Sequence, residues 1–108
     1  MAILADYHTH SKYSRHNHGK STIEENVRTA YEKGLRQVAI TDHGFNQKMF
    51  GIRREDLAKA RKEVEAAKEQ FPIDVLLGVE ANIISSHGDL DITEQDYENL
   101  DIVLCGFH

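Results

Sequence analysis

The 108-residue chain has few of the residues that characterise cross-linked, low-complexity or membrane proteins. Its one cysteine, Cys105, cannot form an internal disulfide, and its apolar neighbours predict a buried, reduced thiol. The chain has only one proline and seven glycines, which excludes a low-complexity sequence. No window approaches the roughly 18 apolar residues of a membrane span. We therefore expect one soluble, cytoplasmic domain over residues 1–108.

The chain also lacks a long basic stretch, and its formal net charge is −5. Proteins that bind nucleic acid without sequence preference neutralise phosphates with clustered lysine and arginine, so this activity is not expected here. A small anionic ligand would need a local positive centre. In an acidic protein, a cluster of metal ions supplies such a centre most economically.

What the chain does have is a regular alternation of short apolar runs and amphipathic segments. The patterns predict strands over residues 2–7, 35–41, 73–79 and 101–105, helices over 22–33 and 54–70, a short helix from Thr93 to about Asn99, and a hairpin around His87 and Gly88. The first strand has the apolar character of a strand buried on both faces. This order implies a parallel α/β sheet with right-handed crossovers.

Histidine and carboxylate side chains follow the apolar run of each predicted strand. His8 and His10 follow the first, Asp42 and His43 the second, Glu80 the third, and His108 the fourth. The carboxyl ends of parallel strands lie at one edge of a sheet, where α/β proteins place their chemistry. Incidental surface histidines would not be expected to gather at four strand ends.

These residue types favour a particular class of metal. Side chains two residues apart on a strand point to the same side, so His8 and His10 can share one ion. Imidazole and carboxylate without thiolate favour zinc, manganese or iron(II). Glu80 is the natural bridge between two ions, and paired ions can clamp a phosphate and generate hydroxide. Asp6 and Asp42 are candidates to orient ligating imidazoles, although Asp42 could instead only begin the loop.

Four segments together resemble the PHP family (polymerase and histidinol phosphatase domains). They are Asp6-Tyr-His-Thr-His10, Thr41-Asp-His-Gly44, Gly78-Val-Glu-Ala-Asn-Ile83 and Gly106-Phe-His108. The resemblance spans the whole chain in the family's order. It implies a distorted TIM-like (β/α)7 barrel with three metal ions at the carboxyl ends of its strands.

The resemblance also implies a role for each matching residue. His8 and His10 would hold one metal, Glu80 would bridge it to a second that His108 also holds, and His43 would bind a third. The family adds a histidine from the loop after the first strand. Both His16 and His18 are available there, and the spacing from the following helix favours His18.

The chain departs from the family in one respect. Family members continue past the fourth strand and supply a further histidine and an Asp-x-His pair. We therefore expect residues 1–108 to be the N-terminal part of the barrel, containing about its first four strands. The missing half, or a second copy of the chain, would close it, and the 108 residues alone are expected to be inactive.

The leading hypothesis is hydrolysis of a small phosphomonoester by a metal-bound hydroxide, with histidinol phosphate as the leading substrate. Two other hypotheses stay open. One is an amidohydrolase-type metal hydrolase, which also begins with His-x-His. The other is a non-catalytic PHP module associated with a polymerase. The sequence does not identify the metal or the general acid.

Overall fold

The computed structural model describes residues 3–15, 19–47, 49 and 51–106. In chain order the elements are β1 (Ala5–Thr9), α1 (Ile23–Glu32), β2 (Gln37–His43), α2 (Arg54–Gln70), β3 (Asp74–Asn82), α3 (Glu94–Glu98) and β4 (Ile102–Gly106). None of the helices in this part of the chain is long and apolar enough to cross a bilayer.

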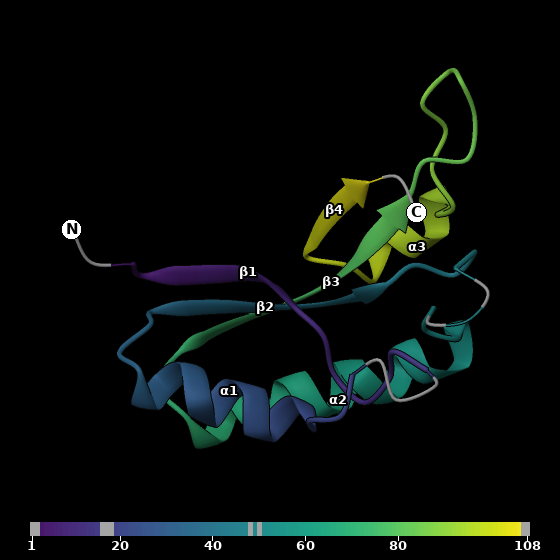
Figure 1. The fold of residues 1–108 in the computed structure, drawn as a ribbon. Helices are drawn as coiled ribbons and strands as arrows, with labels where there is room; N and C mark the ends of the chain where they lie inside the picture. The colour runs from purple at the N-terminus through teal and green to yellow at the C-terminus, as the bar shows by residue number, and fades with distance from the viewer. Residues whose placement is uncertain (1–2, 16–18, 48, 50, 107–108) are drawn as a thin grey trace.

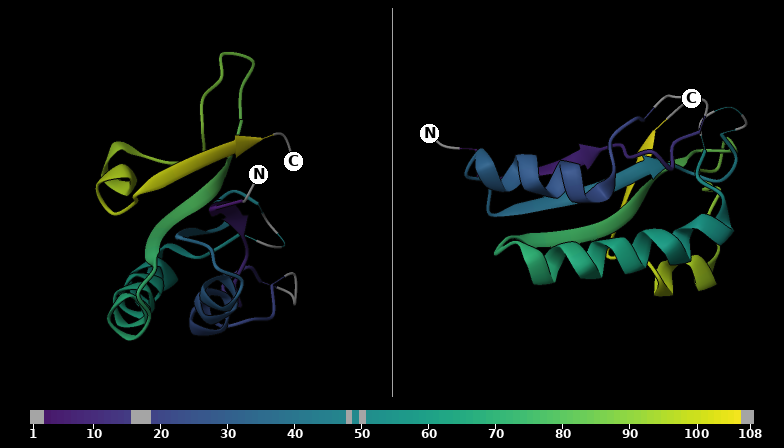
Figure 2. Two further views of the ribbon diagram at one scale, coloured as in Figure 1. Left: turned by 90° about the vertical axis from the view of Figure 1, so that its left-hand side faces the viewer. Right: turned by 90° about the horizontal axis from the view of Figure 1, so that it is seen from below.

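The four strands form one parallel sheet in the order β1-β2-β3-β4. Helices α1 and α2 lie side by side on one face of the sheet, and the sheet curls away from them toward β4 (Figures 1 and 2). The predicted α/β fold with parallel β/α units is confirmed. The curled sheet is half of a barrel wall.

Helix α1 begins and ends where its sequence predicts. The Thr22 hydroxyl accepts a hydrogen bond from the Glu25 backbone N–H, and the Glu25 carboxylate accepts one from the Thr22 N–H. This reciprocal cap satisfies two backbone donors that a helix start leaves without partners. Gly34 follows the helix with φ of 82°, a conformation that glycine adopts without strain.

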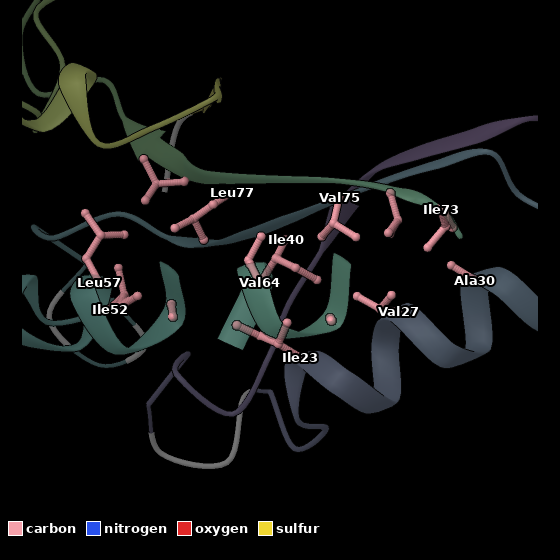
Figure 3. Packing of buried hydrophobic residues seen from close by; sticks show 14 of the residues in the cluster. Ile23, Val27, Ala30, Ile40, Ile52, Leu57, Val64, Ile73, Val75 and Leu77 are labelled. Carbon is pink, nitrogen blue, oxygen red and sulfur yellow. The ribbon is translucent and has the colours of Figure 1, made fainter. Parts of the chain in front are cut away.

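The hydrophobic core lies between the sheet and the two long helices (Figure 3). Ile23 and Val27 of α1 and Val64 of α2 are fully buried against Ile40 of β2 and Leu77 of β3. These apolar residues recur at three- to four-residue intervals on the helices and at every second residue on the strands. Burial of this face therefore fixes which side of the sheet the helices cover.

Two expectations about burial are wrong. Strand β1 is exposed over Asp6, Tyr7 and His8 because it is a sheet edge with an open face in the described structure. Cys105 is also exposed. It pairs in register with Ala81 on the helix-facing side, but in the described chain the long helices pack mainly on β2 and β3.

The strands extend further than their apolar runs. Strand β2 continues through Asp42 and His43, and β3 continues through Glu80 to Asn82. Parallel pairing uses backbone groups, so polar residues can prolong a strand whose neighbour continues beside it. The predicted ligands His43 and Glu80 thus lie within the sheet and are held by its regular backbone.

The predicted hairpin after β3 is confirmed and rises beyond the sheet edge (Figure 1). Ile83 and Leu90 form an antiparallel bridge, and the Ile84 N–H donates to the Asp89 carbonyl at 2.7 Å. At the turn, the Ser85 hydroxyl donates to the Asp89 carboxylate, and Gly88 adopts φ of 85°. The hairpin is therefore braced by its own residues.

Candidate metal centre

The β2–β3 ladder places a histidine beside a carboxylate. His43 and Glu80 are paired in register, and Nδ1 of His43 lies 3.0 Å from Oε1 of Glu80. Both side chains are largely buried, with 9% and 13% of their surface exposed. The backbone adds a further link, because the Gly44 N–H donates to the Glu80 carbonyl at 2.8 Å.

Strand β1 brings two more histidines to the same carboxylate. Nε2 of His8 lies 2.9 Å from Oε2 of Glu80, and Nε2 of His10 lies 3.6 Å from Oε1. The two Nε2 atoms are 3.3 Å apart. Ligands about 2.1 Å from one tetrahedral ion are separated by about 3.4 Å, so these donor atoms fit a single divalent metal.

The exposure of the candidate ligands decreases from His8 inward to His43. His8, His10 and Glu80 offer ligand atoms that all lie within 4.8 Å of one another. The His8 side chain is 54% exposed and that of His10 is 19% exposed, so the cluster runs from solvent at β1 inward to His43. An ion held here would be reachable from the open face of the sheet.

His10 makes two further contacts, one with the His43 ring and one with helix α1. Its ring packs edge-on against that of His43, with 4.4 Å between the ring centroids. Its backbone carbonyl accepts a hydrogen bond from Nδ2 of Asn26 in α1, at 3.0 Å. The sequence did not predict this contact, because a polar residue on a helix surface can face either solvent or a neighbouring loop.

Asp42 makes its observed hydrogen bonds with the loop after β1. Its Oδ1 accepts from the Ser11 N–H at 2.6 Å and from the Ser14 hydroxyl at 2.7 Å, and its Oδ2 accepts from the Ser11 hydroxyl at 2.7 Å. Burial raises the pKa of this carboxyl, and the hydrogen bonds from Ser11 and Ser14 oppose that rise. The prediction that Asp42 orients an imidazole remains a prediction.

Asp6, the other candidate to orient an imidazole, accepts from the His8 backbone N–H at 3.0 Å. This contact lies within β1, which contains both Asp6 and His8. An imidazole contact for Asp6 likewise remains a prediction.

The loop after β1 is anchored on its outer side to α2 and the residues before it. The Tyr13 hydroxyl donates to the Glu63 carboxylate, and Nε of Arg15 donates to the Gly51 carbonyl at 2.6 Å. Burial and the neighbouring Glu63 raise the pKa of Tyr13. The Lys12 N–H donates to the Ser21 carbonyl at 2.7 Å and closes the loop.

A second buried carboxylate, Asp91, was not anticipated from the sequence. It accepts from the backbone N–H groups of Asn82 and Asn46, each at 2.8 Å, and from the Asn82 side chain at 2.5 Å. A Cβ on Gly44 would lie 2.8 and 2.9 Å from its oxygens, so a larger residue at position 44 would displace the Asp91 carboxylate. Asp91 thereby ties the base of the hairpin to the residues after His43.

Three histidines named in the sequence analysis, His16, His18 and His108, lie outside the described residues. Their predicted roles stay predictions. His87 is exposed on the hairpin and does not belong to the cluster of His8, His10 and Glu80.

Comparison with known proteins identifies the family. The PHP domain model matches residues 6–108, which is nearly the whole chain. The chain belongs to the PHP domain family. A protein named "Probable phosphatase" from Thermoanaerobacter pseudethanolicus is 38% identical over 112 residues, and one from Caldanaerobacter subterraneus is 35% identical over 114 residues. Both alignments cover 100% of this chain and 42% and 40% of those relatives.

The structural comparison agrees with the PHP assignment. A crystal structure of a protein from Listeria monocytogenes, assigned as a histidinol phosphatase, superposes with a TM-score of 0.71 at 17% identity. The match covers 96% of this chain and 44% of that one. At this identity the likeness shows the fold alone. The PHP chain corresponds to less than half of the length of that protein.

Proposed function

We propose that this chain forms part of a metal-dependent phosphoesterase that hydrolyses small phosphomonoesters. The observation that carries the proposal is the convergence of His8, His10 and His43 on Glu80, at the carboxyl edge of a parallel sheet. The PHP family assignment and relatives named as phosphatases support the same activity.

Glu80 is suited to bridge two ions because its carboxylate has two oxygens and lies beside His43 as well as beside the pair of His8 and His10. Oε2 faces His8, while Oε1 faces His10 and His43. His18 and His108 are the proposed additional ligands of a three-ion cluster of zinc, manganese or iron. Bound divalent ions would lower the pKa of water to supply a nucleophile and would neutralise phosphate charge.

Histidinol phosphate is the proposed substrate to test first. The structural likeness to a protein assigned as a histidinol phosphatase favours this choice among small phosphomonoesters. The substrate's phosphate would approach from the open face, because the His8 side chain is the most exposed member of the cluster.

The test uses the complete gene product. Elemental analysis measures its metal content, and hydrolysis of p-nitrophenyl phosphate and histidinol phosphate is followed with and without a chelator. We expect cleavage that the chelator abolishes and manganese or zinc restores, with the higher kcat/KM for histidinol phosphate. Bis(p-nitrophenyl) phosphate serves as the diester control. Absence of bound metal, together with no monoester hydrolysis after manganese addition, would refute the proposal.

We also propose that further β/α units complete the site by pairing with β1 and β4, the two outer strands of the described sheet. The chain spans about two fifths of the relatives' length, which supports units equivalent to the rest of those relatives. Light scattering on residues 1–108 tests whether a second copy can substitute. A monomer that binds metal weakly favours units from a longer chain, whereas a dimer with full metal content favours self-association.

A further inference from the structure

Strand pairing does not account for the position of His10. Pairing between β1 and β2 is irregular, with a register shift between Asp6 and Thr9. Strand β1 ends at Thr9, so His10 lies just past the ladder. Its ring is nevertheless held 4.4 Å from that of His43, which the regular β2–β3 pairing fixes.

A short covalent and hydrogen-bonded path joins these two histidines. Ser11 directly follows His10, and Asp42 directly precedes His43. The Asp42 carboxylate accepts from both the backbone N–H and the hydroxyl of Ser11, at 2.6 and 2.7 Å. Ser14 adds a third hydrogen bond at 2.7 Å, so the Asp42 carboxylate contacts the loop at two residues.

We propose that Asp42, Ser11 and Ser14 form a clamp that positions His10 against His43, with Asp42 as the positioning residue. The three residues are named the Asp42 clamp. This inference rests on the proposed function, because the separation of the two rings matters for activity only if both bind metal.

The clamp residues are buried, so losing any of their hydrogen bonds would be costly. Ser11 and Ser14 are 0% exposed and Asp42 is 1% exposed. A buried polar group that loses its partner carries the full cost of having left water, so the loop gains by keeping all three bonds. Gly19 packs tightly on the same loop, because a Cβ there would lie 1.9 Å from the Ser11 carbonyl oxygen.

The clamp depends on the arrangement of hydrogen-bond donors and acceptors at position 42, and it does not require a negative charge there. An asparagine at position 42 could place its carbonyl oxygen where Oδ1 accepts from the Ser11 N–H and the Ser14 hydroxyl. Its amide could then donate to the Ser11 hydroxyl, which can accept as well as donate. Asp42→Asn therefore keeps the clamp, whereas Asp42→Ala removes it. If Asp42 acted through its negative charge, both variants would lose its effect.

The experiment titrates cobalt(II) into the complete gene product and records its visible absorption spectrum, which reports ligand number and geometry. We expect Asp42→Ala to bind cobalt about tenfold more weakly and with an altered spectrum, as for loss of other groups that orient ligands. Asp42→Asn should stay within about threefold of the wild type with the same spectrum. Ser11→Ala combined with Ser14→Ala, which keeps the Ser11 N–H, should fall between them.

Val64→Ala is the matched control for lost stability, because Val64 is fully buried in α2 away from the carboxyl edge. It should lower stability and leave cobalt binding unchanged. The clamp is refuted if Asp42→Ala keeps the wild-type affinity and spectrum, or if Asp42→Asn binds as weakly as Asp42→Ala. If Asp42→Ala does not fold, the double serine variant decides by the same criteria.

A second measurement separates this inference from the proposed function. Should the wild type bind no cobalt, the proposed function fails, and hydrogen exchange at the Ser11 amide still tests the clamp. Its protection should fall in Asp42→Ala and persist in Asp42→Asn. Protection that stays at the wild-type level in both variants would overturn the clamp. A loss of protection in both would also overturn it, because the effect would then depend on the charge of Asp42.

Discussion

The two faces of the sheet are made from alternate residues of the same strands and have opposite characters. On the helix-facing side, Val75 and Leu77 are 1% exposed and pack in the core. On the other side, Leu76 is only partly buried, and a polar ladder runs from the Tyr7 hydroxyl through the Gln37 side chain to the Asp74 carboxylate. The ligand cluster lies on this second, open face.

The difference separates stability from function within one sheet. Apolar surface removed from water stabilises the fold on the covered face. The open face contributes less to stability and can therefore carry histidines, carboxylates and hydroxyls where an ion and a substrate can reach them. Variants of Leu77, Glu80 and Tyr7 test this division, and a variant of Asp96 tests the contact between α3 and α2. The expected effects decrease from Leu77 to Tyr7.

Leu77→Ala should lower the free energy of unfolding by about 3 kcal/mol, because it leaves a cavity in the core. Leu76→Ala, one residue away on the open face, should cost less than about 1.5 kcal/mol because less surface returns to water. Urea denaturation of both variants measures the contrast. Equal losses would mean that the open face is buried in solution and that the two faces are not different in kind.

Glu80→Gln should weaken metal binding about 100-fold, since the charged oxygens that face three histidines are replaced by a neutral amide. Calorimetry with zinc or manganese gives the affinity. The matched control is Glu65→Gln, an exposed α2 residue beside Arg61 and Lys68. Wild-type affinity in Glu80→Gln would place the metal elsewhere.

Asp96→Asn should cost about 1 kcal/mol at neutral pH by weakening the link from α3 to Arg54, whose exposed side chain limits the effect. The Arg54 hydrogen bond is the main cause that lowers the pKa of Asp96 in the folded state. Its stabilisation is therefore present above the ordinary aspartate pKa of about 3.9 and is lost as pH falls through the lower folded value.

Unfolding curves of wild type and Asp96→Asn should accordingly converge in acid. A gap between the two proteins that stays constant from pH 7 to pH 3 would show that the Asp96 charge contributes nothing.

Tyr7→Phe should change stability by less than about 0.5 kcal/mol, because it removes one hydrogen bond from a side chain that is 43% exposed. Thermal unfolding at neutral pH is a sufficient measurement. A loss as large as that of Leu76→Ala would mean that the polar ladder holds the open face together and would weaken the distinction drawn above.

Local chemistry made much of this fold predictable. Helix α2 was expected over residues 54–70, and it is found there because its apolar stripe and the following Pro72 define both its period and its end. Strand ends placed His8, His10, His43 and Glu80 at one edge because parallel strands share a direction. The periodicity of the sequence carries this information directly.

The contacts around the cluster were not predictable in the same way. Ser11 and Asp42 are 31 residues apart, and Asn82 and Asp91 meet across the hairpin. Serine and asparagine in polar loops follow no period, so nothing in the sequence tells which of them will be buried. The predicted ends of β2 and β3 came too early in the chain for a related reason, because backbone pairing carries these strands past their apolar residues.

The order β1-β2-β3-β4 has a consequence for how the molecule is made. Each strand after the first pairs with the strand that precedes it in the sequence, so every new β/α unit adds to an edge that already exists. Contacts between neighbouring units close shorter loops than contacts between distant ones, which favours rapid, stepwise assembly. By the time β3 is in place, four of the proposed ligands have met, so these side chains come together before β4 is added.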